Sequence, residues 1–307
     1  MPPQRHGGMV DTATFTAVDL SRLPAPAVIE QLSFEQIYGA MLASLRELLP
    51  TFDATVESDP VLKILQMADY RELLLRARLN DAARAVMPAF ATGADLDQLA
   101  ALMGLIRLQL TAGDATLGIL PTYESDEDFR RRLVLAPEGY SVAGPEGAYI
   151  FHALSSDGEV LDASAVSPAP GEVLVTVLAR SGDGTASAAL LGAVAAHVSD
   201  ENVRPLTDAV TVQGATIVPY AIDATIRTFS GPDGGIVIAE ARKRIEAYAA
   251  RQHRLGLDIT RSGIFGALHQ EGVQNVVLAS PGADLVIDRT AASYCTGITI
   301  THAGTGE

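Results

Sequence analysis

Tryptophan is absent from this 307-residue sequence, and aromatic residues make up only 5% of it. Such scarcity argues against the stacking surfaces on which proteins bind sugars or single-stranded nucleic acid. Basic residues are also few, because 22 Lys and Arg stand against 37 Asp and Glu, a net charge of −15. An acidic surface repels phosphate backbones, and the longest basic cluster is only Arg130–Arg132. We therefore expect no nucleic-acid partner.

Cysteine occurs once, at Cys295, so neither an internal disulfide nor a multi-cysteine metal site can form. No two of the six histidines have the i,i+3 or i,i+4 spacing of a helix-borne zinc site. The N-terminus lacks an apolar signal region, and no run approaches the ~18 apolar residues of a membrane helix. We expect a protein made in the cytoplasm, without a membrane partner or a cofactor.

A helical segment is predicted at residues 33–105, after an N-terminal arm at residues 1–32. Ser33 precedes apolar residues at spacings of three and four, the pattern of an amphipathic helix, which Pro50 ends. A second helix is expected to begin with Ser58 or Asp59 as its cap. Seven apolar residues form one stripe along this second helix: Val61, Leu65, Ala68, Leu75, Leu79, Ala82 and Val86. So long a stripe predicts a partner helix and makes these seven residues candidate interface residues.

Beyond a third helix, expected to be capped by Asp95, the pattern changes from helices to mixed elements. Residues 106–144 predict a connecting segment with a short helix. Residues 145–214 then give the order helix-strand-strand-helix-strand, and residues 215–307 the order strand-helix-helix-strand. The predicted fold class is α+β: an N-terminal helical bundle segment followed by two small domains of the split βαβ kind.

The stretch "YESDEDFRRRL", residues 123–133, carries the densest charge in the sequence. Glu124 to Asp128 suggest, as an alternative function, an enzyme that uses carboxylates to bind a divalent cation. Ser125 and Asp128, however, have the spacing of a helix capping box. Three acid-to-base pairs at i,i+4 follow: Asp126–Arg130, Glu127–Arg131 and Asp128–Arg132. Successive helical residues point about 100° apart, so these acids do not converge on one ion.

The capped, salt-bridged helix is therefore favoured over a metal or catalytic site. Neither a GxSxG elbow nor an HExxH motif occurs in the sequence. We expect a protein that is not an enzyme, with no catalytic, cofactor-binding or metal-binding residues.

Four segments occur in an order that resembles baseplate J-like proteins, the wedge components of contractile phage tails and related injection machines. They are "ESDPVLKILQMADYRELLLRARLNDAARAVM", "GADLDQLAALMGL", "YESDEDFRRRL" and "LDITRSGIFGALHQEGVQNVVLASP". The resemblance extends from about residue 20 to 290. Pro88 is a departure, because it falls where the family pattern would continue as a helix.

The resemblance implies a structural subunit of the virion tail baseplate. Its N-terminal helices would join a core bundle with a second copy of this protein and a second wedge subunit, baseplate I-like. Its α+β part would contact neighbouring wedges in a six-fold ring around the hub, with a lysozyme-like sheath-initiator subunit nearby. The ring would couple host recognition to sheath contraction. An oligomeric adaptor outside phage, built from the same α+β units, is the other alternative.

Overall fold

The computed structural model describes residues 28–53, 58–231 and 233–306, together with Leu20, Leu23, Pro26 and Val56. Most of the predicted N-terminal arm lies outside the described residues. The chain divides into two compact units, one helical and one α+β. The helical unit comprises the described residues up to Arg107 together with Ser125–Leu133, and the α+β unit comprises Leu108–Glu124 and the chain from Val134 onward.

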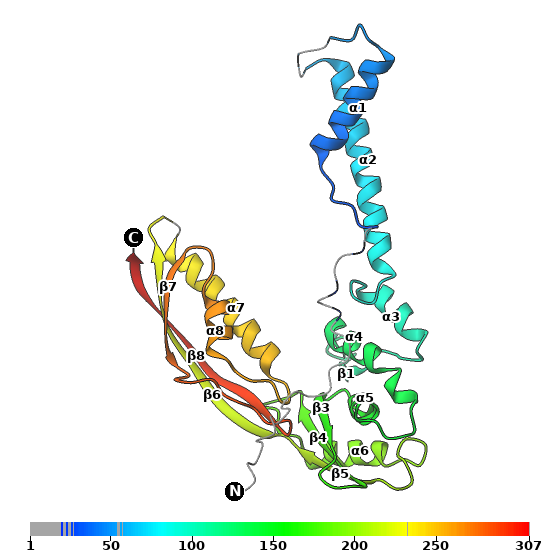
Figure 1. Cartoon of the computed structure of the whole chain (residues 1–307), viewed down its shortest axis with the longest axis vertical. Coiled ribbons are helices and arrows are strands. Elements are labelled where there is room, and N and C mark those ends of the chain that lie inside the picture. Colours follow the sequence, from blue (N-terminus) through cyan, green and yellow to red (C-terminus); the bar gives the residue numbers. More distant parts are fainter. Residues whose placement is uncertain are drawn as a thin grey trace, which may run out of the picture. The chain divides into compact units, whose positions relative to one another are not determined.

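The helical unit begins with a pair of helices, α1 and α2, that pack side by side (Figure 1). Their bounds, with those of the next helix, are α1 Phe34–Leu48, α2 Pro60–Ala85 and α3 Gly93–Ala101. Ser33 caps α1 by accepting a hydrogen bond from the Gln36 N–H, and Asp59 caps α2 in the same way from Val61. The predicted cap of α3 is wrong, because the helix starts two residues before Asp95, with Thr92 at the cap position.

A short ladder and a helix follow: β1 Gln109–Thr111, β2 Thr122–Tyr123 and α4 Asp126–Leu135. The two strands are antiparallel. Phe129 and Leu133 of α4 are buried with Leu96 and Ala100 of α3 and with Ala91. This cluster is the core of the part of the helical unit that α3 and α4 form.

The first layer of the α+β unit is a three-stranded sheet with two helices. Its elements are α5 Glu146–Ser156, β3 Val160–Val166, β4 Glu172–Ala179, α6 Ala188–Val198 and β5 Ala209–Gly214. The strand order is β3-β4-β5, with β3 and β4 antiparallel and β4 and β5 parallel. Apolar side chains of both helices pack with those of the strands in one core cluster.

The second layer is also a three-stranded mixed sheet with two helices, but its elements follow a different order along the chain and two of its strands are longer. Its elements are β6 Thr216–Phe229, α7 Gly234–Gln252, α8 Arg261–Leu268, β7 Val273–Ser280 and β8 Ala291–Gly306. The order is β7-β6-β8, in which β6 is antiparallel to β7 and parallel to β8. The helices α7 and α8 cover one face of this sheet (Figure 1). The predicted α+β class is confirmed, although the sequence pattern missed β8.

A small cluster of apolar residues joins the two layers, with Leu255 and Ala292 from the second layer and Leu178 from the first. Polar contacts reinforce it, because the Leu255 N–H donates to the buried carboxylate of Asp162 at 2.9 Å. The Ser164 hydroxyl likewise donates to the carbonyl of Arg289 at 2.6 Å. Such buried, satisfied contacts fix one layer on the other.

Candidate subunit interface and the charged helix

The apolar stripe of α2 stands largely exposed. Leu75 and Leu79 are 67% and 69% accessible, and Val61 and Val86 are exposed as well. Ala68 and Ala82 are also exposed, and only Leu65 of the seven predicted residues is half-buried. Removing such an apolar surface from water is favourable, so the stripe remains a candidate interaction site.

The apolar surface of α2 is wider than the sequence stripe indicated. Four further large apolar side chains of α2 are exposed: Ile64, Met67, Tyr70 and Leu74. Met67, Tyr70 and Leu74 fall outside the three- and four-residue spacing of the predicted stripe, so the sequence pattern did not include them. Buried residues of α2 are Leu62, Asp69 and Asn80. The isolated chain therefore covers a partly polar face of α2 and leaves its most apolar face free.

The segment before α1 is fastened to α2 by Asn80. Its side-chain oxygen accepts from the Glu30 N–H at 3.1 Å, and its side-chain nitrogen donates to the Glu30 carbonyl at 2.9 Å. Arg76 adds ion pairs to Glu30 at 3.2 Å and to Glu72 at 2.6 Å. These contacts satisfy the backbone of a segment that has no ladder or helix of its own.

A groove of about 500 Å³ runs between α1 and α2. Its walls include Ile37, Met41 and Leu45 from α1 and Leu65 and Arg76 from α2. The α1 residues recur at spacings of four, so the groove follows the helix axis and has the form that receives another helix.

Asp69, an acidic residue, lies unexpectedly on the buried face of α2. Its side chain is fully buried, and neither carboxylate oxygen has a hydrogen-bond partner among the described residues. Burial raises the pKa of Asp69, and the negative charges of Glu72 and Glu35 raise it further. A buried carboxylate without a partner is costly, so Asp69 weakens the pairing of α1 with α2.

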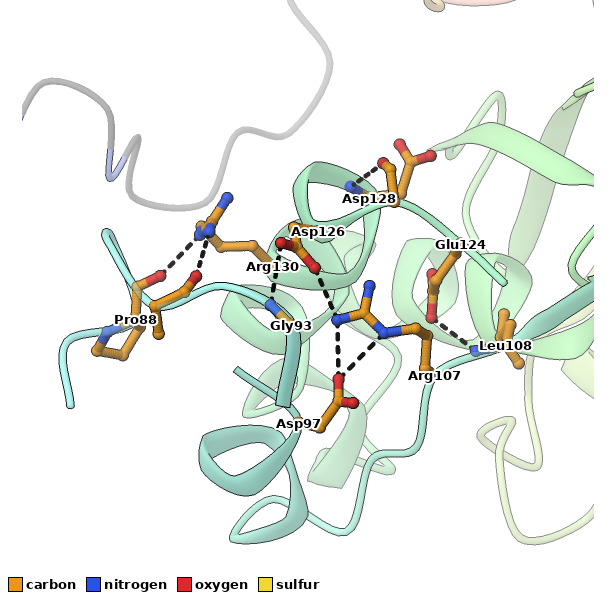
Figure 2. Close-up of polar contacts among 11 residues, drawn as sticks. Pro88, Gly93, Asp97, Arg107, Leu108, Glu124, Asp126, Asp128 and Arg130 are labelled. Carbon is orange, nitrogen blue, oxygen red and sulfur yellow. Dashed lines mark hydrogen bonds and ion pairs between the residues drawn. The ribbon is translucent and has the colours of Figure 1, made fainter. Parts of the chain in front are cut away.

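The charged stretch begins with a capped helix. Ser125 Oγ accepts from the Asp128 N–H at 3.1 Å. Just before it, the buried Glu124 carboxylate accepts from the Leu108 N–H at 2.9 Å. Figure 2 shows Glu124 and Asp126 directed at different partners.

Asp126 is held by two donors from other segments (Figure 2). One carboxylate oxygen accepts from the Gly93 N–H at 3.1 Å and the other from Arg107 at 2.8 Å, while Arg107 also reaches Asp97 at 2.8 Å. Burial alone would raise the pKa of Asp126, but the hydrogen bonds of Gly93 and Arg107 and the charges of Arg107 and Arg130 together lower it.

The arginines of α4 reach backbone carbonyls that sequence spacing could not reveal. Arg130 donates to the carbonyls of Pro88 at 2.7 Å and Ala91 at 2.6 Å, and the buried Arg132 donates to Ile106 at 2.8 Å. Arg130 also lies close enough to Asp126 to affect its pKa. The expected pairs of Glu127 with Arg131 and of Asp128 with Arg132 stay predictions.

This geometry joins α4 to the segment between α2 and α3 and to the residues after α3. Within the described part of the chain, no three His, Cys, Asp or Glu side chains gather as a metal ion would require. None of the described helices is long and apolar enough to cross a membrane. The charged stretch thus holds backbone segments of the helical unit together. Many of the large side chains that α2 exposes, in contrast, are apolar, as is usual in proteins that associate with other chains.

Comparisons with known proteins identify the family. Residues 57–114 match the Baseplate J-like N-terminal domain, residues 141–214 the Baseplate J-like central domain, and residues 220–301 the Baseplate J-like protein C-terminal domain. A relative named "Baseplate protein J", from Escherichia phage P2, is 46% identical over 299 residues, which cover 94% of this chain and 99% of the relative. The chain belongs to the baseplate J-like family and is a structural component of a phage tail baseplate.

Among solved structures, a chain in a cryo-EM structure of the anti-feeding prophage baseplate, 6-fold symmetrised, is similar to 58% of this chain and to 44% of its own length. The TM-score is 0.37 and the sequence identity 14%. This likeness is too distant to add to the assignment.

Proposed function

We propose that this chain is a wedge subunit that joins a helical core bundle through α2. The bundle contains a second copy of the chain and one copy of a baseplate I-like subunit. The observation that carries the proposal is the exposed stripe of α2, from Val61 to Val86, on a helix whose other face is already covered by α1. The groove between α1 and α2 offers a second apolar surface, so one copy can contact two partner helices.

The α+β unit then contacts neighbouring wedges and closes a six-fold ring around the hub, near a lysozyme-like sheath initiator. The ring transmits host recognition to sheath contraction, and assembly takes place in the host cytoplasm. The phage relative favours this role over an adaptor outside phage. Both carboxylate oxygens of Asp126 already accept hydrogen bonds, one from the Gly93 N–H and one from Arg107. This arrangement supports a structural role for the charged helix over a cation-dependent enzyme.

The test is a double substitution, Leu75→Glu with Leu79→Glu, in the full chain. Two buried charges in the bundle should abolish self-association and co-purification with the baseplate I-like subunit. The matched control is Lys63→Glu with Arg84→Glu, at exposed charged positions of the same helix that lie further round from the stripe. The control should associate normally, and all variants should keep the unfolding transition of the α+β unit. Equal binding by the two double variants would refute the bundle.

A further inference from the structure

The two α+β layers follow each other almost without a linker. β5 ends at Gly214 and β6 begins at Thr216, so only Ala215 lies between the two sheets. The Ala215 N–H donates to the Val177 carbonyl of the first layer at 2.9 Å. The next N–H, that of Thr216, donates to the Thr290 carbonyl of the second layer at 3.0 Å. Hinges are usually a few loop or terminal residues that can change their φ and ψ angles, so two consecutive residues bonded into different layers make a poor hinge.

A second contact joins β3 to the residues that follow α7. The buried carboxylate of Asp162 accepts hydrogen bonds from the Ala163 N–H at 2.8 Å and from the Leu255 N–H at 2.9 Å. Arg254 donates to the carbonyl of Leu161 on the same strand. The Leu255 side chain is fully buried in the apolar cluster that joins the layers. Separating the layers here would leave a buried carboxylate without one of its donors, which is costly.

The loop between β7 and β8 makes a third contact. The Arg289 carbonyl accepts a hydrogen bond from the Ser164 hydroxyl of β3 at 2.6 Å. The Arg289 side chain forms an ion pair with Glu146, the first residue of α5. Only 21% of the Arg289 side chain and 32% of the Glu146 side chain are accessible, so solvent screens this pair only partly. One loop of the second layer is thus bonded to two elements of the first.

A fourth contact depends on a glycine. Gly184, in the turn after β4, has a φ of +96° and lies against His253, which follows α7. A Cβ atom on Gly184 would lie 3.0 Å from His253 Nε2 and 2.5 Å from Leu178. His253 is itself held, because its Nδ1 lies 2.6 Å from the Ser293 carbonyl oxygen of β8. Glycine therefore permits both the backbone conformation and the close approach of the two layers.

These four contacts lie on separate elements of both layers. In the first layer they involve β3, α5 and the turn after β4, and in the second the end of α7, the loop before β8 and β8 itself. Relative motion is the usual expectation for two domains of one chain. Buried polar groups that have their hydrogen-bond partners make an arrangement rigid instead. A rotation of one layer that spared any one of these contacts would strain the others.

We propose that the two α+β layers form one rigid arm, which keeps its shape when the baseplate rearranges. The rearrangement then takes place at the boundaries of the α+β unit and not between its layers. This inference rests on the proposed function, because it gives the arm a task in the wedge. A rigid arm passes a displacement at one end to the other end, whereas a joint between the layers would absorb it.

The test measures a distance between the layers by double electron–electron resonance. Spin labels are attached to Ala193→Cys on α6 and Lys243→Cys on α7, both exposed positions, in the full chain with Cys295→Ser. An excess of unlabelled chain ensures that only distances within one copy are measured. We expect one narrow distance in the free chain, and the same distance in assembled baseplates before and after sheath contraction. A broad distribution in the free chain, or a shifted distance after contraction, would overturn the inference and leave the helical bundle standing.

A double variant tests whether the contacts between the layers hold the arm. Asp162→Ala with Arg289→Ala removes the acceptor of the Leu255 N–H and the ion pair with Glu146. The distance distribution should widen by about twofold or more. The matched control is Asp223→Ala with Arg242→Ala, which replaces an exposed acid and an exposed arginine within the second layer and should keep the narrow distance.

Both double variants should fold, because each layer has an apolar core of its own, and circular dichroism checks this. A distribution that stays narrow without Asp162 and Arg289 would overturn the inference, since these contacts would not be what holds the layers. Failure of the labelled chain to enter baseplates, together with a narrow distance in the free chain, would refute the wedge role alone and support the rigid arm.

Discussion

The guanidinium of Arg107 lies 2.8 Å from a carboxylate oxygen of Asp126, nineteen residues further along the chain. The same guanidinium lies over the ring of the buried Phe129, 4.8 Å from its centroid. Only 16% of the Arg107 side chain is accessible, so the contact is poorly screened by water. This relationship fixes the start of α4 against the residues that follow α3.

Replacing Arg107 by alanine should destabilise the helical unit by about 1–3 kcal/mol, because Asp97 and Asp126 would both lose a charged donor. The measurement is the denaturant midpoint of that unit, followed by circular dichroism. Glu127→Gln is the control, since Glu127 is an exposed acid in the first turn of α4, next to Asp126. Equal midpoints for the two variants would contradict the role of Arg107.

Acid should weaken the same contact. The pKa of Asp126 is lowered in the folded chain, so its ionised form is stabilised by folding. The stabilisation is present above the unfolded pKa of about 3.9 and is lost as the pH falls through the lower folded value. Asp126→Asn should therefore destabilise the chain near neutral pH and lose this effect in acid. The measurement is the free energy of unfolding of the variant and the native chain as a function of pH. If the difference between them stays constant across the acid range, ionisation of Asp126 is not the cause.

The Asn80 side chain should determine whether the segment before α1 stays on α2. Asn80→Ala removes both hydrogen bonds to Glu30 and should cost about 1–2 kcal/mol. Hydrogen exchange at the Glu30 amide should rise by about one to two powers of ten, because that amide would lose its acceptor. Asn80→Asp keeps the acceptor and should protect the Glu30 amide better than alanine does. Unchanged exchange in Asn80→Ala would show that other contacts hold the segment.

Local sequence signals predicted the helices of this chain well. Ser33 and Asp59 stand where caps are needed, and apolar spacing located α1 and α2. The same spacing located one apolar stripe on α2. It could not show that α1 would cover the face of α2 that carries Leu62 and Asp69. That choice depends on tertiary packing, which overrides a helix's own periodicity.

Long-range contacts explain what was missed. β8 is rich in Thr and Gly at its end and has weak apolar alternation, so its strand conformation comes mainly from pairing with β6, more than seventy residues earlier. The charged stretch was predicted to pair within its own helix. That pairing stays a prediction, but Arg130 and Arg132 also reach carbonyls of Pro88, Ala91 and Ile106, and no spacing rule links such distant backbone groups.

Asp69 should make the pairing of α1 with α2 sensitive to pH. Its pKa is raised in the folded chain, chiefly by burial, so folding favours the protonated form. The cost of the buried charge is therefore full above the folded pKa. It disappears as the pH falls from the folded pKa toward the unfolded value of about 3.9. The helix pair should gain stability in mild acid, in the direction opposite to the effect of Asp126.

Asp69→Asn removes the charge and should stabilise the helix pair by about 1–3 kcal/mol at neutral pH. The gain should shrink as the pH falls through the folded pKa of Asp69, because the native side chain then becomes neutral as well. Asp81→Asn is the matched control, since Asp81 is an exposed acid on the same helix and pairs with Arg84. Hydrogen exchange of α1 amides at several pH values measures the effect. A gain that does not depend on pH, or one that Asp81→Asn reproduces, would show that the buried charge of Asp69 does not limit the packing of α1 on α2.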